Sequence, residues 1–154
     1  MQFSTKRDDL FLDPIEAVVT GLGMQVVEVS VSRHHGIVQV RIVVYKKEGI
    51  GVNDCSKVHR SIQARFELAF PNQDIYIEVA SPGIDRHIKD AYEFPVFINR
   101  GVSCYRIDIS DWTSGIIADA DENRVILRTR AGLVELPYGN IAKAKLDYSQ
   151  EVEH

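Results

Sequence analysis

The chain has 154 residues, of which 45% are apolar and 26% charged, and its formal net charge is −4. This composition is typical of a globular protein in solution. No segment approaches the roughly 20 apolar residues that a membrane-spanning helix needs, and residues 1–9 lack the apolar core of a secretory signal. We therefore expect a cytoplasmic protein without a membrane partner.

The first half of the chain shows the pattern of a small α/β module. Apolar periodicity predicts a helix, a β-hairpin with its turn at 33–36, a second helix and a strand, over residues 10–22, 24–45, 54–70 and 75–80. Asn53 is expected to cap the second helix, and Pro71 follows its end. The predicted inner face of this helix consists of Cys55, Val58, Ile62, Phe66 and Ala69. The order αββαβ predicts a sheet covered on one side by two helices, and we assign this module to residues 1–85.

The strand over 75–80 leads into a segment that combines turn residues with an acid and a base. Ser81, Pro82 and Gly83 fit a type II turn, because Pro82 fixes φ and Gly83 tolerates positive φ. We expect the chain to reverse there. Asp85 and Arg86 then suit a salt bridge, a phosphate contact or a partner's charged groups. The simpler alternative is a surface ion pair that closes a tight turn.

Residues 86–154 have the pattern of a small all-β domain. A short helical or irregular piece over 88–99 precedes five predicted strands, over residues 102–109, 115–120, 124–129, 133–136 and 142–146. Short strands with tight turns fit a closed barrel of the Sm or SH3 type. The tail from Asp147 is polar and is expected to fray. Trp112, in the predicted loop between the first two of these strands, would either anchor a partner or fold over the barrel mouth.

Basic side chains are concentrated in one segment. Each half of the chain, 1–85 and 86–154, has 9 basic and 11 acidic residues, which argues against a general nucleic-acid coat. Residues 33–65, however, carry a local charge of +5. Such a segment can steer one face toward phosphate, or its charges can scatter around a solvated helix and strand. The candidate binding residues are Arg41, Lys46, Lys47, Lys57, Arg60 and Arg65.

The chemistry of catalysis and cofactor binding is missing from the sequence. No two glycines are three residues apart, so a G-x-x-G clamp and a dinucleotide fingerprint are excluded, and no Walker-type lysine loop occurs. Cys55 and Cys104 have no partners at metal-ligand spacing and are typical of small buried hydrophobes. Ser81, Asp85 and His87 are too close in sequence for a hydrolytic triad and lack a nucleophile elbow. We expect no cofactor, no metal and no catalytic residue.

Several sequence segments together resemble the bacterial ribosome maturation factor RimP family. The most specific is Glu-Val-Ala-Ser-Pro-Gly-Ile-Asp-Arg at 78–86, and the others are residues 21–23, 26–29, 51–55, 76–77 and 140–146. These segments occur in the family's order along nearly the whole chain. Two departures are His87, where the family usually has Pro, and a short loop at 110–113.

The resemblance implies a KH-like N-terminal domain, over residues 1–85, and an Sm-like C-terminal barrel, over residues 86–154. It also implies a monomer that binds the free small (30S) ribosomal subunit, with ribosomal RNA and a small-subunit ribosomal protein as partners, and assists its maturation without catalysing a reaction. Because the G-x-x-G clamp is missing, RNA contacts would come from the basic segment, or the main partner would be a ribosomal protein. His87 would leave the linker after Arg86 less rigid than Pro.

Two other functions remain open from the sequence. A general RNA-binding regulator acting through an oligomeric Sm-like barrel would form rings and bind unstructured single strands. A hydrolase using Asp85 and His87 would need a defined substrate. Size in solution separates the ring-forming regulator from the expected monomer.

Overall fold

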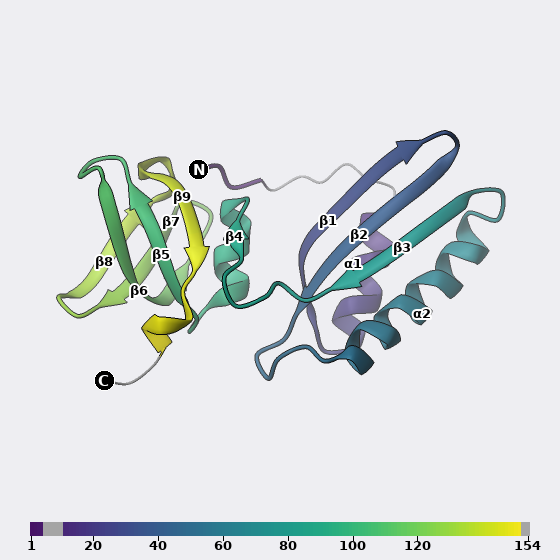
Figure 1. Ribbon diagram of the computed structural model, residues 1–154, viewed down its shortest axis with the longest axis horizontal. Helices are drawn as coiled ribbons and strands as arrows, with labels where there is room; N and C mark the ends of the chain where they lie inside the picture. Colours follow the sequence, from purple (N-terminus) through teal and green to yellow (C-terminus); the bar gives the residue numbers. More distant parts are fainter. Residues whose placement is uncertain (5–10, 152–154) are drawn as a thin grey trace. The chain divides into compact units, whose positions relative to one another are not determined.

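The structure, a computed structural model, describes residues 1–4 and 11–151, and its chain folds into two compact units (Figure 1). They divide between Pro82 and Gly83, and Met1–Ser4 belong with the second unit. The first unit contains helices and strands, and the second is built on a β-sheet with short 3₁₀ helices. The predicted α+β class with an N-terminal α/β module and a C-terminal all-β part is confirmed.

The first unit has the predicted element order αββαβ. Its elements are α1 (Leu12–Gly21), β1 (Gln25–His34), β2 (Ile37–Tyr45), α2 (Val52–Ala69) and β3 (Asp74–Ala80). The sheet order is β1-β2-β3, with β2 antiparallel to β1 and parallel to β3. The parallel pairing of β2 and β3 follows from α2, because a crossover helix returns the chain to the end of the sheet at which β2 begins.

The β1–β2 hairpin turns over two residues. His35 and Gly36 have positive φ values of 49° and 80°, the combination of a type I′ turn, whose twist matches that of the flanking strands. The turn predicted over 33–36 was therefore too long, because Arg33 and His34 still pair with β2.

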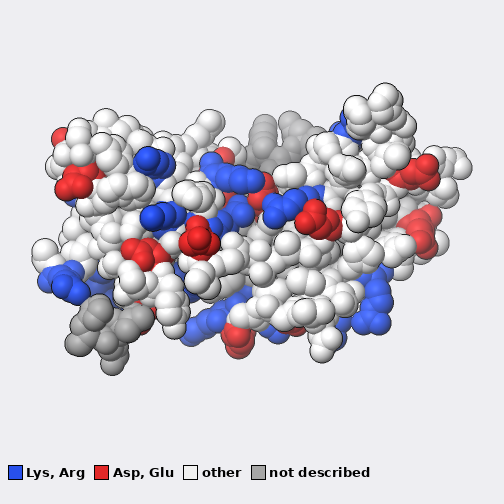
Figure 2. All heavy atoms as spheres, viewed as in Figure 1, with Lys and Arg blue, Asp and Glu red and all other residues white. Residues whose placement is uncertain are grey.

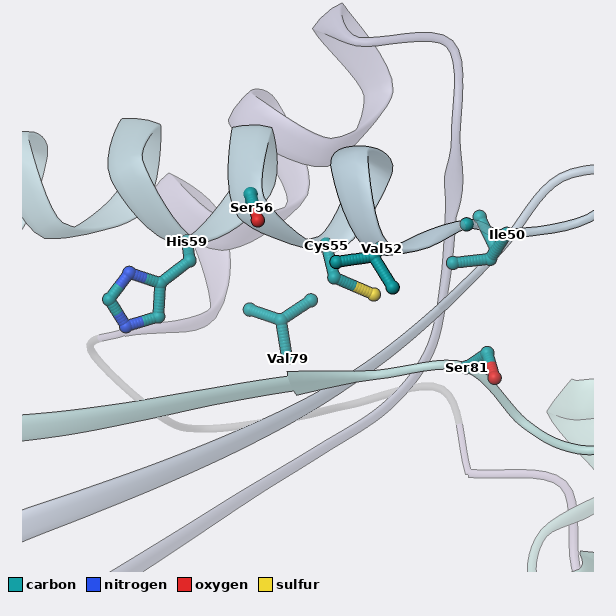
Figure 3. Close-up of a pocket in the computed structure, with 8 residues that line it drawn as sticks. Ile50, Val52, Cys55, Ser56, His59, Val79 and Ser81 are labelled. Atoms are coloured by element: carbon teal, nitrogen blue, oxygen red, sulfur yellow. The ribbon is translucent and has the colours of Figure 1, made fainter.

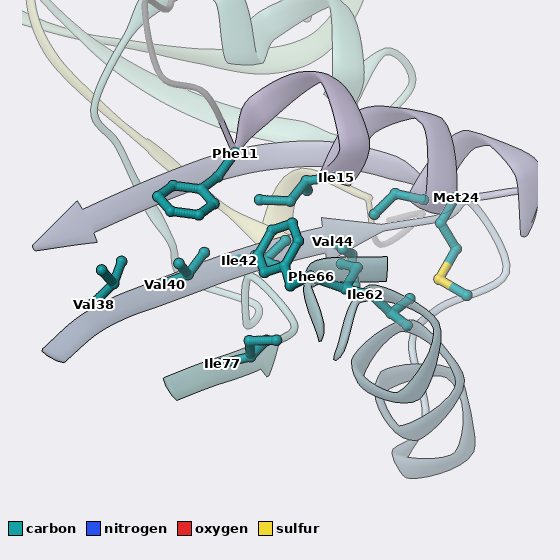
Figure 4. Packing of buried hydrophobic residues seen from close by; sticks show 12 residues of the cluster. Phe11, Ile15, Met24, Val38, Val40, Ile42, Val44, Ile62, Phe66 and Ile77 are labelled. Atoms are coloured by element: carbon teal, nitrogen blue, oxygen red, sulfur yellow. The ribbon is translucent and has the colours of Figure 1, made fainter. Parts of the chain in front are cut away.

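Both helices of the first unit pack on one face of the sheet (Figure 4). The Phe11 ring lies at the centre of an aromatic group, with centroids 5.2 Å from Phe66 and 4.8 Å from Phe70. Ala69, which was predicted on the inner face of α2, is exposed. The buried core residues are Phe11, Ile15, Val19, Met24, Val38, Val40, Ile42, Val44, Val58, Ile62, Phe66 and Ile77.

Helix α2 begins two residues earlier than predicted. Gly51, not Asn53, is the N-cap residue, with extended backbone at φ −102° and ψ 175°. The carboxylate of Asp54 accepts the Gly51 backbone N–H at 2.9 Å and the Lys46 Nζ at 3.0 Å. These two bonds hold the pKa of Asp54 below its ordinary value. The helix N-terminus is thus capped by an acidic side chain in the first turn. Such a cap is missed when only the N-cap residue itself is considered.

The second unit contains six strands, one more than predicted. They are β4 (His87–Ile88), β5 (Gly101–Arg106), β6 (Asp111–Ala120), β7 (Arg124–Thr129), β8 (Gly132–Pro137) and β9 (Ile141–Leu146), with 3₁₀ helices η1 (Ala91–Phe97), η2 (Tyr138–Asn140) and η3 (Tyr148–Glu151). Their order is β4-β9-β5-β6-β7-β8. Within residues 83–151 no pairing joins β4 to β8, so the predicted full closure is wrong. Since β4 has two residues, that edge offers little backbone to another strand.

The C-terminal tail packs on the sheet through residue 151. Ser103 Oγ donates to Asp147 Oδ2 at 2.8 Å, and the Arg100 guanidinium bonds the Glu151 carboxylate at 3.1 Å. The prediction of a frayed tail is wrong over 147–151, because these polar side chains have partners on the sheet. Residues 152–154 lie outside the described residues.

Residues Met1–Ser4 lie against the second unit. The Phe3 ring stacks on the Tyr138 ring with centroids 6.0 Å apart, and Ser4 Oγ donates to Asp90 Oδ2 at 2.6 Å. Composition of this short segment gave no signal for these contacts, since they involve residues far away in the sequence.

Candidate functional site

Helix α2 presents three of the predicted basic residues to solvent. Lys57, Arg60 and Arg65 are exposed on the helix, Lys57 and Arg60 away from its buried face of Val58, Ile62 and Phe66 and Arg65 at the border of that face. No carboxylate of the described residues lies within ion-pair distance of these three side chains. We call Lys57, Arg60 and Arg65 the α2 basic face. On the molecular face drawn in Figure 2, basic and acidic side chains are interspersed, so such a cluster is a local feature.

The other predicted cations lie apart from the α2 basic face. Arg41 lies on β2 between Ser30 and Glu78 of the neighbouring strands, on the sheet face opposite the helices. Its guanidinium is 3.7 Å from both the Glu28 and the Glu78 carboxylates. Lys46 is bonded to Asp54, and Lys47 is exposed in the following loop. The structure therefore divides the basic segment between two faces and a loop.

A pocket of about 430 Å³ opens at the start of α2 (Figure 3). The loop before the helix, its first two turns and the end of β3 form the walls. Val79 points from the sheet toward the helix, where Val52 and Cys55 face it. The lining residues are Ile50, Gly51, Val52, Cys55, Ser56, His59, Val79 and Ser81.

Cys55 and His59 share this pocket but do not form an activated nucleophile. Their side chains point to different ends of the pocket in Figure 3, and no hydrogen bond joins them. Burial, followed by the nearby Asp54 charge, raises the pKa of the Cys55 thiol. A thiol that acts as a nucleophile needs the opposite shift. The pocket is thus suited to a side chain or a small group more than to covalent chemistry.

The segment after β3 does not make the predicted reversal. Gly83 has the expected positive φ of 78°, but the chain bends at 84–85 instead of turning at 81–83. Ser81 lines the pocket at the start of α2, and Pro82 is half-buried. Asp85 is exposed. This segment is an extended connection, because no ladder partner follows directly on β3 to close a turn.

Arg86 is buried and pairs with Glu93, not with Asp85. The Arg86 Nε lies 2.8 Å from Glu93 Oε1, and their side chains are 7% and 0% exposed. Glu93 Oε2 also accepts the backbone N–H groups of Lys89 and Asp90, at 3.0 and 3.2 Å. The carboxylate thus receives the several donors that a buried charge requires. The alternative of a surface ion pair between Asp85 and Arg86 is wrong, and the Arg86 side chain is held inside its own unit.

Trp112 lies in a strand, not in the predicted loop. It belongs to β6 and stands opposite Tyr105 of β5, with its side chain 39% exposed. The connecting loop is residues 107–110. Two lysines of β9, Lys143 and Lys145, lie near the Trp112 ring. Sequence reasoning missed both lysines, although the alternation of residues 141–146 could have placed them on one face of a strand.

A membrane-spanning helix and a metal-binding group of side chains are both absent from the described residues. No helix in residues 11–151 has the length and hydropathy to cross a membrane. No group of three His, Cys, Asp or Glu side chains in the described part of the chain could hold a metal ion.

Comparison with known proteins gives one consistent result. The family model described as RimP N-terminal domain matches residues 14–85. Curated proteins named ribosome maturation factor RimP match over most of the chain. The protein from Borrelia hermsii is 31% identical over 132 residues, which cover 86% of this chain and 90% of the relative. That from Borrelia recurrentis is 29% identical over 134 residues, covering 87% and 92%.

Proposed function

Because the chain belongs to the ribosome maturation factor RimP family, we propose that it binds the free small ribosomal subunit during assembly and assists its maturation without catalysing a reaction. The observation that carries this proposal is the match to relatives of that name along 90% of a relative's length. The partners would be ribosomal RNA and a small-subunit ribosomal protein. The protein would act in the cytoplasm as a monomer.

The α2 basic face is the part of the basic segment best placed to contact ribosomal RNA. Lys57, Arg60 and Arg65 are exposed and have no carboxylate partner among the described residues. Arg41 and Lys46 would first have to leave their carboxylates. Lys47, exposed in the loop after β2, would add a contact apart from the α2 basic face. Phosphate contacts of this kind position a protein on RNA without reading its sequence.

The segment 81–86 would set the orientation of the two units on the subunit. Ser81 lines a pocket of the first unit, and Arg86 is fixed within the second by Glu93. We propose that the residues between these two points contribute to this orientation. Pro82 fixes its own φ, while Gly83 and Asp85 are exposed and allow adjustment. A partner on the subunit could select one arrangement.

Deletion of the gene in its host tests the function directly. We expect slowed maturation of small subunits, with free small subunits and precursor ribosomal RNA accumulating. Unchanged subunit profiles in both cold and warm growth would contradict the assignment. Light scattering on the purified protein tests the monomer, and ring-sized oligomers would instead support a general RNA-binding regulator.

Charge reversal on α2 tests the proposed contact surface. The variant K57E/R60E should lose most of its co-sedimentation with purified small subunits, because each lost phosphate contact weakens binding and the new carboxylates repel phosphate. The matched control is R128E/R130E, which makes the same charge change at exposed positions of the second unit. Co-sedimentation equal to wild type in a folded K57E/R60E protein would remove α2 from the interface.

A further inference from the structure

Three adjacent strands of the second unit place an aromatic pair and a lysine in one row. Tyr105 of β5 stands opposite Trp112 of β6 on one side and Lys143 of β9 on the other. The next row along the same face contains Ser103 and, on β9, Lys145. The Trp112 and Tyr105 rings meet edge to face, with centroids 5.5 Å apart and planes at 78°. We call Tyr105, Trp112, Lys143 and Lys145 the aromatic–lysine cluster.

The two lysines of the cluster lie near the aromatic rings and have no ion-pair partner among the described residues. Lys143 Nζ is 5.7 Å from the Tyr105 ring centroid and 5.5 Å from that of Trp112, and Lys145 Nζ is 5.7 Å from Trp112. These distances are within the range of cation–π attraction. No carboxylate of the described residues forms an ion pair with Lys143 or Lys145.

The acidic groups on the neighbouring strand ends have partners of their own. The Asp108 carboxylate accepts two hydrogen bonds from the Arg106 guanidinium, at 3.1 and 2.8 Å, and the Asp108 backbone N–H donates to Asn140 Oδ1 at 2.9 Å. The Arg106 bonds lower the pKa of Asp108 to about 2. Asp111 accepts the Trp112 backbone N–H at 2.8 Å. Neither Asp108 nor Asp111 forms an ion pair with Lys143 or Lys145.

We propose that the aromatic–lysine cluster binds single-stranded RNA, with an unpaired base stacked on Trp112 and backbone phosphates bound by Lys143 and Lys145. Stacking on an exposed aromatic ring beside basic side chains is the usual chemistry of single-strand recognition. An acidic peptide would use the lysines and leave the ring unused. Bases of a duplex are already stacked on each other and cannot use the ring either. The inference rests on the proposed function in taking ribosomal RNA as the partner.

The chain contains a single tryptophan, so its fluorescence reports on the cluster directly. Titration of the full chain with a short single-stranded RNA should quench this fluorescence to saturation, because a stacked base contacts the indole. A duplex of the same sequence and a polyglutamate peptide should quench it weakly or not at all. Absence of saturable quenching by the single strand, or equal quenching by polyglutamate, would overturn the proposal.

Variants separate stacking from charge, with affinity measured by the anisotropy of labelled RNA. W112A should weaken binding about 5- to 140-fold, which corresponds to roughly 1–3 kcal/mol for one stacked base. K143Q/K145Q keeps both rings and should reduce the salt slope, d log K/d log [salt], by about 1.4 in magnitude, since each phosphate contact on a single strand contributes about 0.7. Thermal melting checks that both variants fold.

The control R128Q/R130Q removes the same charge from exposed positions on β7 and the turn after it. It should bind within about twofold of wild type, as expected for cations outside the contact. A loss equal to that of K143Q/K145Q would overturn the proposal in favour of general electrostatic attraction. Because the assay uses RNA alone, its failure would leave the small-subunit proposal standing, and normal RNA binding with failed co-sedimentation would do the reverse.

Discussion

Arg60 in the first unit and Arg86 in the second both belong to segments that the sequence marks as candidate contacts, yet the structure gives them different environments. Arg60 is exposed on α2 without a carboxylate partner among the described residues. The Arg86 side chain is 7% exposed and lies 2.8 Å from a fully buried carboxylate. An exposed cation can exchange water for phosphate at little cost, whereas Arg86 would have to leave Glu93 unpaired in the interior.

The different environments of Arg60 and Arg86 indicate which cations of this chain are available to bind a partner. The motif that is most specific in the sequence, which ends in Asp85 and Arg86, contributes a structural ion pair through its arginine. The cations with no carboxylate partner are on α2 and in the aromatic–lysine cluster. Changes at the buried pair should therefore alter stability, and changes at the exposed cations should alter binding alone.

The largest loss of unfolding free energy is expected from the substitution E93Q in the second unit. This change keeps the shape of Glu93 but removes the carboxylate charge that faces the buried Arg86 side chain, and the loss of one partner of a buried pair costs about 3–5 kcal/mol of unfolding free energy. Urea titration followed by Trp112 fluorescence measures it, because Trp112 lies in the same unit.

The control for E93Q is E135Q. Its ion pair with Arg124 has an even shorter N–O distance of 2.6 Å, but the two side chains are 39% and 56% exposed. We expect a cost below about 1 kcal/mol. Similar losses for E93Q and E135Q would show that burial does not distinguish the two pairs.

A smaller loss of unfolding free energy is expected from G101A in the second unit. A Cβ at Gly101 would collide with the backbone carbonyl oxygen of Asp147 and approach the Cβ of Gln150 to 2.9 Å. Relief would require the tail helix η3 to move, at a cost of about 1–3 kcal/mol. The matched control is G139A, since no heavy atom lies within 4 Å of a Cβ built there. Equal urea midpoints for the two variants would mean that the tail does not pack on β5.

Local pattern was sufficient to predict most of the first unit. The alternation of residues 37–45 predicted β2 with its observed bounds, and the helical spacing of Val58, Ile62 and Phe66 predicted the buried face of α2. The predicted helix cap was wrong because the capping side chain comes from a different position than the one expected. Asp54 closes the start of α2 from within the first turn, so Asn53 was wrongly assigned as the cap.

The candidate sites were less predictable because they depend on which distant residues meet. The spacing of Arg86 and Glu93 does not identify them as partners, since no single helix or strand contains both residues. Trp112 meets Lys143 and Lys145 through the register of β6, β5 and β9, which is fixed by the whole sheet. Charge counting marked Lys57, Arg60 and Arg65 as candidates, and all three are exposed on α2, as expected for charged residues of a helix that buries an apolar face.

D54N should destabilise the first unit in a pH-dependent way. The Gly51 N–H and Lys46 hold the pKa of Asp54 below its ordinary value, so the ionised carboxylate stabilises the fold above the pKa of the unfolded chain, near 4. This contribution is lost as pH falls through the lower pKa of the folded state. Wild type should therefore be more stable than D54N at neutral pH, and the difference should disappear in acid. If the thermal midpoints of wild type and D54N still differ at low pH, the stabilisation does not come from the ionised Asp54 carboxylate.

The smallest effect is expected from K57Q/R60Q/R65Q, which removes the whole α2 basic face without adding opposite charge. These side chains are exposed and form no ion pair with the described residues, so the unfolding free energy should stay within about 0.5 kcal/mol of wild type. Circular dichroism at the helix band, followed in urea, measures this for α2 directly. Unchanged stability together with weakened co-sedimentation on small subunits would assign these cations to binding. A substantial loss of stability would show instead that they support the fold, as Arg86 does in the second unit.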